Sequence, residues 1–312
     1  MSNLSLVTGG AGFIGSHLVE SLTAAGQRVR VLDDLSTGLR TNLEHIQPAP
    51  ELVAGDLADP ATVQQAVQGT ATVYHLGAIA SVQRSVEAPD VTHRVCATGT
   101  LHVLDAARQA GVRRVVLAAS SSAYGVPQGE VQREDDPLRP LSPYAAAKLA
   151  SEYYAQAFYA SYQLETVCLR FFNIFGPRQR ADSPYSGVIA IFAGLMAAGR
   201  RPLIHGDGLQ TRDFTYVANA VQALRKAALA PSAAGKSYNV GTGRRVNLLD
   251  LTAALNRVLG TDLSPQHGAA RAGDVRHSCA DISLARAELG YEPTIGFEEG
   301  LRLMLQPTPA GG

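Results

Sequence analysis

A run of glycines directly after the first apolar segment constrains the fold of this chain more than any other feature. Leu4 to Val7 is short and apolar, and it runs into Gly9-Gly10-Ala11-Gly12-Phe13-Ile14-Gly15. Apolar residues then recur with helical spacing, and a second apolar segment, Val29 to Leu32, ends in Asp33 and Asp34. Glycines at this spacing allow a tight turn, close approach of a ligand to the backbone, and close packing of helix on strand. The order strand, glycine turn, helix, strand and acid predicts a dinucleotide-binding unit.

The acid at the end of the second strand indicates which dinucleotide is bound. An acid at this place accepts hydrogen bonds from the adenosine ribose and repels the 2′-phosphate of NADP, so the sequence predicts NAD. Arg40 lies a little farther along and would weaken that preference. The cofactor contacts expected from this part of the chain are Gly9, Gly12, Phe13, Ile14, Gly15, Asp33, Asp34, Ser36 and Gly38.

Five more apolar segments predict further strands: 51–57, 72–78, 113–119, 164–170 and 237–240. Ligands of an open parallel sheet lie beyond the carboxyl ends of its strands, so residues at those ends should line one crevice. The cofactor contacts expected there are Asp56, Leu57, Leu76, Gly77, Ala78, Ala80 and Phe171. For Asp56 a helix-capping role is the alternative, because Asp59-Pro60 opens the next helix. His75 has no visible partner in the sequence and is interpreted as structural.

The segment Ser142-Pro143-Tyr144-Ala145-Ala146-Ala147-Lys148 predicts the start of a helix, because proline suits the first turn and alanine is the best helix former. Tyr144 and Lys148 then lie one turn apart on the same face. An ammonium beside a phenol lowers the pKa of the phenol, and such a tyrosine can accept a proton near neutral pH. The alternative is a solvent-exposed pair, since this spacing also arises by chance.

Composition excludes several partners. Lys+Arg and Asp+Glu number 27 each, so no general charge favours nucleic acid or an anionic membrane, and we expect neither as a partner. Cys96, Cys168 and Cys279 are scattered and odd in number, which fits neither a disulfide framework nor a metal site, so no metal is expected. No signal peptide is visible, and the longest apolar stretch, 187–198, is too short for a membrane span. These features predict a cytoplasmic location.

The predicted fold class is α/β, a Rossmann doubly wound parallel sheet with a smaller mixed α/β C-terminal substrate-binding cap. Residues 1–175 would form the NAD-binding domain, joined again by roughly 214–242. Residues 176–312 would form mainly the substrate-binding domain. Helices are expected within it at 188–198, 216–230, 248–259 and 281–289.

The sequence resembles the extended short-chain dehydrogenase/reductase superfamily and, within it, the NAD-dependent UDP-hexose 4-epimerases (the UDP-glucose/UDP-N-acetylglucosamine branch). The matching stretches run in family order over nearly the whole chain: 8–15, 120–125, 142–144 with Lys148, 170–173, 206–208, 212–214, 239–241 and 271–278.

The resemblance implies an isomerase mechanism. Tyr144 as phenolate takes the proton of the sugar 4-hydroxyl while the hydride at C4 passes to NAD⁺, and the resulting 4-keto sugar turns over before hydride returns to its other face. Lys148 would hold the nicotinamide ribose and lower the pKa of Tyr144. Ser120 would hydrogen-bond the 4-oxygen and relay the proton, although Ser121 is adjacent and could take that role. A serine cluster that binds nothing is the alternative.

The resemblance also implies substrate contacts. Asn173 would bind a diphosphate oxygen, and two arginines would pair with the phosphates unless they are simply solvated. An aspartate would accept a hydrogen bond from the uridine ribose. The full expected set is Val82, Ser120, Ser122, Tyr144, Asn173, Gly187, Val188, Arg212, Arg271, Asp274 and Ser278.

Two positions depart from the family pattern. Cys96 stands where the family usually has an asparagine that supports the active-site helix, so this support must be absent or replaced. Ser278 stands where members restricted to unsubstituted hexoses tend to carry a tyrosine. A serine leaves room for a 2-N-acetyl group, which predicts use of UDP-GlcNAc and UDP-GalNAc beside UDP-Glc and UDP-Gal.

Other functions can be weighed on the same residues. A 4,6-dehydratase needs an acid pair where this chain has Ser121 and Ser122. A UDP-glucuronate 4-epimerase or decarboxylase stays open, because Arg84 could bind a carboxylate. A non-catalytic NAD-sensing Rossmann protein would have no use for Tyr144 and Lys148.

Homodimers are common in this family, and the helices at 101–110 and 150–160 permit one, although they equally permit burial within one chain.

Overall fold

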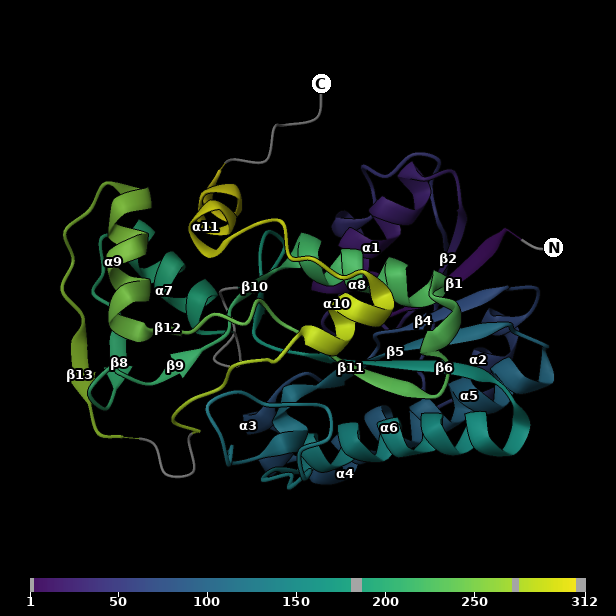
Figure 1. Ribbon diagram of the computed structural model, residues 1–312. Coiled ribbons are helices and arrows are strands. Elements are labelled where there is room, and N and C mark those ends of the chain that lie inside the picture. The colour runs from purple at the N-terminus through teal and green to yellow at the C-terminus, as the bar shows by residue number, and fades with distance from the viewer. Residues whose placement is uncertain (1–2, 181–186, 271–274, 307–312) are drawn as a thin grey trace.

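The computed structural model describes residues 3–180, 187–270 and 275–306. Seven strands form the main sheet in the order β11-β6-β5-β4-β1-β2-β3, and every neighbouring pair is parallel (Figure 1). The strands are β1 (Leu4–Thr8), β2 (Arg28–Asp33), β3 (Glu51–Ala54), β4 (Thr72–His75), β5 (Arg114–Ser120), β6 (Glu165–Phe171) and β11 (Lys236–Val240). This sheet confirms the predicted Rossmann-type fold class.

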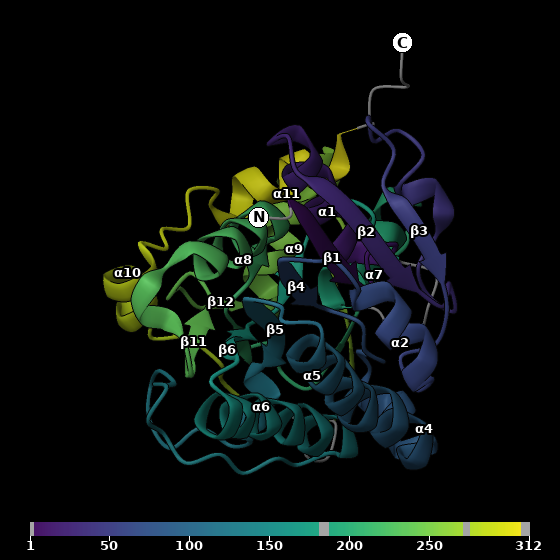
Figure 2. The ribbon, with the colours of Figure 1, turned by 90° about the vertical axis from the view of Figure 1, so that its right-hand side faces the viewer.

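Helices cover both faces of the sheet (Figures 1 and 2). One face carries α2 (Pro60–Val67), α5 (Gly99–Gln109) and α6 (Pro143–Tyr162). The other carries α1 (Phe13–Ala24), α8 (Val217–Leu229) and α10 (Ser283–Leu289). Each layer buries its own apolar cluster against the strands, because residues on a buried strand point alternately to the two faces.

The remaining elements form a smaller mixed α/β cap beside the carboxyl edge of the sheet (Figure 1). Its helices are α7 (Val188–Ala197), α9 (Leu248–Leu259) and α11 (Phe297–Leu305). Its two-stranded pairs are β8 (Leu203–His205) with β13 (Gln266–Gly268), β9 (Thr211–Arg212) with β12 (Val246–Asn247), and β7 (Ile174–Phe175) with β10 (Thr215–Tyr216). The cap has a separate apolar cluster that includes Phe192, Leu251 and Leu301.

Two predicted strands end earlier than the apolar pattern suggested. β3 ends at Ala54, and the following turn is stabilised where the Asp56 carboxylate accepts a hydrogen bond from the Ala58 amide. β4 ends at His75, because the Gly77 amide donates to the hydroxyl of Thr8 rather than continuing the ladder. Polar side chains therefore end these strands at the sheet edge.

Several short elements were not predicted. The segment between β4 and α5 forms α3 (Val82–Glu87), α4 (Pro89–His93) and a π-helical turn at Arg94–Thr98. Short 3₁₀ turns occur at Arg40–Asn42, Ser121–Tyr124 and Pro231–Ala233. Among the helices that the structure describes, none is both long and apolar enough to cross a membrane.

Candidate active site

The glycine turn between β1 and α1 leaves room for a bound group. Gly9 has φ +68°, and a Cβ on Gly15 would lie 2.1 Å from the Gly9 carbonyl oxygen, so both positions require glycine. A Cβ on Gly12 would meet only that carbonyl, at 3.1 Å. Gly12 caps α1 without a side-chain hydrogen bond, so no side chain satisfies the first amides of the helix. Such a helix start is suited to a pyrophosphate, and these residues fit a dinucleotide.

Asp33 ties this turn to the loop after β2. Its carboxylate accepts hydrogen bonds from the amides of Ala11 and Leu35, both at 2.9 Å. Burial raises the pKa of Asp33, while the two amides act in the opposite sense. Each carboxylate oxygen retains a second lone pair for a ribose hydroxyl. Asp34 is exposed and accepts from the amide and hydroxyl of Ser36, and Gly38 is buried beside Asp33.

Further predicted cofactor contacts lie at the ends of β3 and β4. Asp56 accepts from the Ala58 amide at 2.9 Å and lies 3.4 Å from Arg94. The cap of α2 is Asp59, whose carboxylate accepts from Ala61, so the capping alternative for Asp56 is wrong. Leu57 is buried, and a Cβ on Gly77 would lie 2.5 Å from its side chain. Leu76, Ala78 and Ala80 follow β4 at the same edge.

Tyr144 and Lys148 lie in the first turns of α6. Ser142 caps this helix by accepting a hydrogen bond from the Ala145 amide at 3.1 Å. The Lys148 side chain is 4% exposed. Its ammonium makes no hydrogen bond or ion pair with the residues that the structure describes. Burial lowers the pKa of Lys148, and the nearby Cys96, Cys168 and Glu152 act in the opposite sense. An ammonium without a protein partner at the end of a mostly buried side chain is available to a polar group of a bound ligand.

The pKa of Tyr144 differs from the prediction. The residue keeps partial exposure, but burial of its phenol raises the pKa to about 12, and Cys96 adds to the rise. The Ser120 hydroxyl lowers it as a hydrogen-bond partner, whereas Lys148 is not among the groups that shift it. The prediction that Lys148 lowers this pKa is therefore wrong for the chain on its own, because burial of the phenol has the larger effect.

The serine cluster at the end of β5 places Ser120 beside Tyr144. The Ser120 and Ser122 hydroxyl oxygens lie 2.8 Å apart, and the Ser122 amide donates to Ser120 at 3.2 Å. Ser121 begins the 3₁₀ turn and is not among the groups that shift the pKa of Tyr144. Phe171, the last residue of β6, pairs with Ser120 in the sheet.

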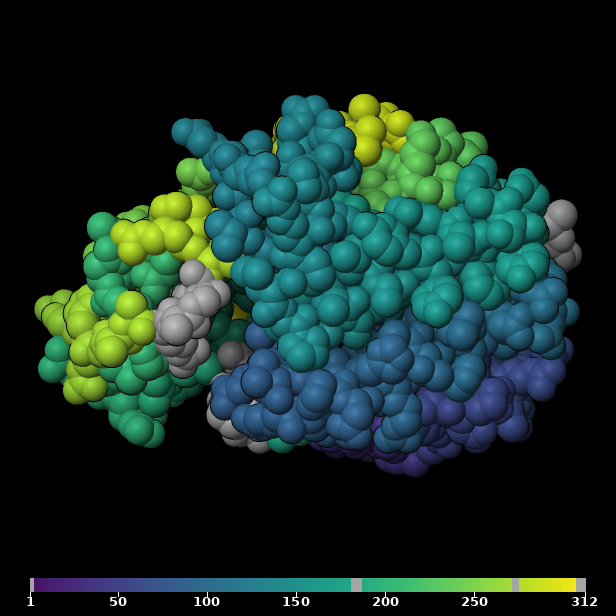
Figure 3. Space-filling view, turned by 90° about the horizontal axis from the view of Figure 1, so that it is seen from below, coloured from purple at the N-terminus to yellow at the C-terminus, as the bar shows by residue number. Residues whose placement is uncertain are grey.

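The predicted substrate contacts come from both core and cap. Asn173 is exposed just after β6, Gly187 caps α7, and Val188 is its first residue. Val82 begins α3 and is 50% exposed. Arg212 on β9 donates to the carbonyls of Thr211 and Arg276, at 2.9 and 3.4 Å. Seen from below, core and cap meet along a notch in the surface (Figure 3).

The segment that carries Ser278 runs along β9. Ser278 is half-buried, and its amide donates to the Thr211 carbonyl at 3.2 Å. Thr211 pairs in parallel with His277, so Ser278 lies level with Arg212 on β9. Arg271 and Asp274 lie outside the described residues.

Sequence reasoning missed the role of Asp213, which is completely buried. Its carboxylate accepts hydrogen bonds from the amide and hydroxyl of Thr242, from the Gly243 amide and from the Ala280 amide, at 2.8, 2.6, 2.9 and 3.2 Å. Asp213 thus fastens the turn after β11 to the segment that carries Ser278. The only hint in the sequence is its place directly after Arg212.

His75 was interpreted as a structural residue without a partner, and the second half of that interpretation is wrong. Its ring nitrogens pair with the hydroxyls of Thr8 and Thr100, at 2.7 and 3.0 Å. These partners lie 67 and 25 residues away in the sequence, so no local pattern could reveal them.

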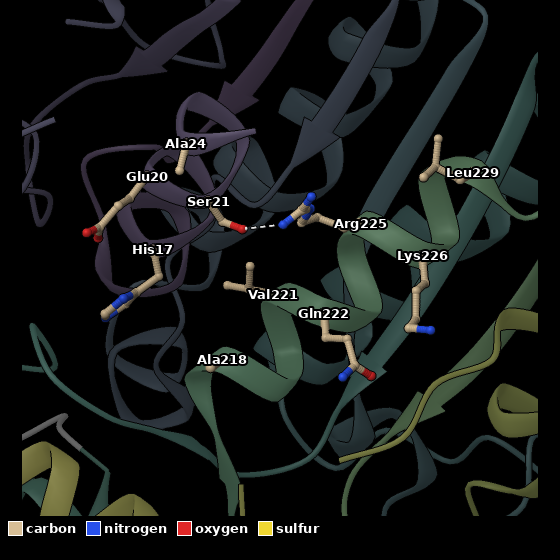
Figure 4. A pocket seen from close by; sticks show the side chains of 10 residues that line it. All are labelled: His17, Glu20, Ser21, Ala24, Ala218, Val221, Gln222, Arg225, Lys226 and Leu229. Atoms are coloured by element: carbon tan, nitrogen blue, oxygen red, sulfur yellow. Dashed lines mark hydrogen bonds between the residues drawn. The ribbon is translucent and has the colours of Figure 1, made fainter. Parts of the chain in front are cut away.

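A cavity of about 620 Å³ lies elsewhere, between α1 and α8 (Figure 4). Its lining includes Glu20, Val221, Arg225 and Leu229, and Arg225 donates to Ser21 at 2.9 Å. None of the predicted site residues lines this cavity. Within the described ranges, no group of three or more His, Cys, Asp or Glu side chains could hold a metal ion.

Known proteins share this architecture along its whole length. A family model described as GDP-mannose 4,6 dehydratase matches residues 6–304. The UDP-glucose 4-epimerase of Mycolicibacterium smegmatis is 40% identical over 301 residues, which cover 95% of this chain and 96% of that protein.

Two solved structures are similarly close. A UDP-N-acetylglucosamine 4-epimerase from Methanobrevibacter ruminantium, in complex with UDP-N-acetylmuramic acid, is 35% identical, with a TM-score of 0.92 and 97% of each chain covered. A UDP-glucose 4-epimerase of Thermus thermophilus, in complex with NAD, is 39% identical, with a TM-score of 0.87, covering 96% of this chain and 97% of that one. The chain therefore belongs to the GDP-mannose 4,6-dehydratase family of the extended short-chain dehydrogenase/reductase superfamily, together with these sugar-nucleotide 4-epimerases.

Proposed function

We propose that this chain is an NAD-dependent UDP-sugar 4-epimerase in which Tyr144 is the catalytic acid and base. One observation carries the proposal. Lys148 is mostly buried, its ammonium has no partner among the described residues, and it lies one turn from Tyr144 on α6. Tyr144 in turn has the Ser120 hydroxyl as its hydrogen-bond partner. This group lies at the sheet edge where the glycine turn also opens.

The binding roles follow from the described donors. The open start of α1 would hold the pyrophosphate, Asp33 the adenosine ribose, and Lys148 the nicotinamide ribose. Bound NAD supplies the hydride acceptor and donor for C4 of the sugar. Ser120 is the better candidate than Ser121 for passing the proton between Tyr144 and the sugar 4-oxygen, because Ser120 is the hydrogen-bond partner of the phenol.

Tyr144 keeps its proton in the chain alone, because its pKa is about 12. It must lose this proton to act as a base near neutral pH. Lys148 lies on the same helix face as Tyr144 and carries a positive charge. A bound ribose would fix the Lys148 ammonium beside the phenol, where its charge would lower the pKa of Tyr144.

The residues at the end of β5 fit epimerisation better than dehydration. A 4,6-dehydratase requires an acid pair next to the strand-end hydroxyl, and this chain has Ser121 and Ser122 there. No acidic residue is among the groups that shift the pKa of Tyr144.

The test is to incubate the purified protein with UDP-galactose, without added NAD, and to measure UDP-glucose. We expect conversion by the wild-type protein. Tyr144→Phe should lower kcat by about a hundredfold or more while NAD stays bound. A non-catalytic NAD-sensing protein is the remaining alternative. It would convert no UDP-sugar and would be indifferent to this change, and that outcome would overturn the proposal.

The sugar range rests on Ser278. Its side chain is small and half-buried on the segment that follows β9. We propose that UDP-GlcNAc and UDP-GalNAc are substrates beside UDP-Glc and UDP-Gal. Conversion of UDP-galactose without any conversion of UDP-N-acetylgalactosamine would contradict this.

A UDP-glucuronate 4-epimerase or decarboxylase is the second candidate. Arg84 is half-buried on α3 and has no acidic partner in the described part of the chain. A free guanidinium could bind the C6 carboxylate of a uronic acid. Incubation with UDP-glucuronate, followed by assays for CO₂ and for UDP-galacturonate, separates these reactions from hexose epimerisation. Arg84→Ala should abolish only the uronate reaction.

A homodimer through α5 and α6 is also proposed. These helices lie side by side on one face (Figure 2), and α6 exposes Tyr153, Tyr154 and Tyr162, at 52%, 41% and 54%. Exposed aromatic residues on one helix favour burial against a partner. Light scattering should show that Tyr153→Glu converts a dimer to a monomer, whereas Leu229→Glu, at an exposed position of α8, leaves the dimer intact.

We also propose how the chain divides into domains and where in the cell it is located. Residues 1–175 with 214–242 would hold the cofactor, since β11 joins the main sheet and α8 packs on α1. Residues 176–312 would mainly hold the substrate. Free, buried cysteines at 96, 168 and 279 fit a reducing cytoplasm.

A further inference from the structure

A buried chain of hydrogen bonds runs from the glycine turn to the catalytic helix. The Gly77 amide donates to the Thr8 hydroxyl at 3.1 Å, and Thr8 pairs with Nδ1 of His75 at 2.7 Å. Nε2 of His75 lies 3.0 Å from the Thr100 hydroxyl, which lies 3.1 Å from the hydroxyl of Ser151 on α6. Every one of these side chains is at most 1% exposed.

The hydrogen-bond partners of His75 decide which of its two ring nitrogens carries the proton. If Nε2 carries the proton of a neutral His75, the Thr8 hydroxyl donates to Nδ1 and Nε2 donates to Thr100. The single Thr100 hydrogen then goes to the Cys96 carbonyl, which also accepts from Ser151. The opposite tautomer would leave the Thr8 hydrogen without an acceptor among the described residues. Burial lowers the pKa of His75 to about 3, and the positive charge of Lys148 adds to this, so the ring is neutral at working pH.

The far end of the chain meets the backbone at the position where the family usually has asparagine. Cys96 lies in the π-helical turn, and its carbonyl accepts hydrogen bonds from the hydroxyls of Thr100 and Ser151, at 2.5 and 2.8 Å. The Cys96 thiol is buried against Ala97 and Ala147. A carbonyl exposed by the π-turn thus takes over the support that an asparagine side chain would give.

Ser151 is well placed to affect the catalytic pair. It follows Lys148 by three residues, so the two side chains are neighbours on one face of α6. The next residue, Glu152, pairs with Arg170 of β6 at 2.6 Å. The Glu152–Arg170 ion pair keeps α6 on the sheet when the hydrogen-bond chain through Ser151 is removed. A loss of alignment can therefore be separated from a loss of folding.

We propose that His75 is a positioning residue which, through Thr100 and Ser151, aligns Lys148 and Tyr144 with the glycine turn that holds the cofactor. The proposal rests on the function proposed above. Three of its readouts, the His75 tautomer, hydrogen exchange in α6 and NAD affinity, do not depend on activity.

The first readout is the tautomer. In the spectrum of ¹⁵N-histidine-labelled protein, His75 should appear neutral with the proton on Nε2 from pH 5.5 to 8. A proton on Nδ1, or a titration within this range, would overturn the hydrogen-bond direction. This result is independent of any epimerase activity.

The second readout compares Thr100→Val with Thr252→Val. Both threonines are buried in helices, and Thr252 only donates to its own helix in the cap, at 2.8 Å. Thr100→Val should speed hydrogen exchange at the first two turns of α6, slow turnover by about tenfold to a hundredfold, and weaken NAD binding. Thr252→Val should lower the Tm and leave exchange in α6 and kcat unchanged.

The third readout is rescue. His75→Leu should lower kcat and shift the pH profile of kcat, with the KM for UDP-galactose changed by less than about threefold, because sugar binding uses the cap. His75→Gln, which keeps a donor and an acceptor, should recover most of the loss.

If His75→Leu lowers only the Tm and leaves kcat, its pH profile, NAD affinity and exchange in α6 unchanged, His75 is merely structural and the proposal fails. If wild-type protein converts no UDP-sugar, the function fails, while exchange, NAD affinity and the tautomer still test the alignment.

Discussion

The cofactor half and the sugar half of the site are built differently. In the proposed cofactor half, Asp33 and His75 are buried and hydrogen-bonded, Asp33 to the Ala11 amide and His75 to the Thr100 hydroxyl, although Asp34 is exposed. In the sugar half, Val82 and Asn173 are exposed, and Ser278 is fixed only through its backbone. From this difference we expect that the proposed reaction at C4 depends on a rigid framework, and that the choice of sugar depends on a few replaceable side chains.

The largest effect should come from filling the glycine turn. Gly15→Ala places a Cβ about where the Gly9 carbonyl now lies, at 2.1 Å, so the turn must open. We expect unfolding free energy to fall by about 3 kcal/mol and NAD to be lost. Gly296→Ala is the control, because a Cβ there meets nothing within 4 Å. Urea unfolding and bound NAD measure both, and equal stability of the two variants would contradict a rigid cofactor half.

Asp213→Asn should give the next largest effect. The amide nitrogen would face backbone donors that now bind a carboxylate, which costs about 2 kcal/mol. We expect the KM for the UDP-sugar to rise about tenfold, since the segment carrying Ser278 loses its anchor at Ala280. NAD affinity should stay unchanged. A fall in NAD affinity instead would show that the two halves are not separable.

Ser278→Tyr tests whether the sugar half is replaceable. A phenol at this half-buried position should exclude a 2-N-acetyl group. We expect kcat/KM for UDP-GalNAc to fall by about tenfold or more relative to UDP-galactose, with the rate on UDP-galactose retained. Equal losses on both substrates would place Ser278 outside the sugar pocket.

The last prediction concerns stability in acid. The folded pKa of His75, about 3, is below its unfolded value of 6.5, so the unfolded chain binds one more proton between these values. This contribution to stability is complete above pH 6.5 and is lost as the pH falls toward 3, by at most about 1.4 kcal/mol per pH unit. Urea unfolding of His75→Gln should therefore show a shallower decline between pH 6.5 and 4.5 than the wild-type protein. Parallel curves would mean that His75 is not buried as a neutral ring.

The sequence predicted those features that arise from local pattern. The glycine turn, seven strands and the start of α6 follow from spacing over a few residues, and the largest shifts of a boundary occur where polar side chains such as Asp56 end a strand. The partners of His75 and Asp213 could not be predicted, because Thr100 and Ala280 are far away in the chain. The pKa of Tyr144 was mistaken because sequence spacing shows a neighbouring cation but not the burial of the phenol.

The π-helical turn at Arg94–Thr98 also affects how related sequences should be read. Because a main-chain carbonyl holds Thr100 and Ser151, the side chain at position 96 has no hydrogen-bonding duty. Any residue small enough to fit against Ala97 and Ala147 serves there. In this chain the support of α6 therefore depends on the hydroxyls at positions 100 and 151 and not on the side chain at position 96.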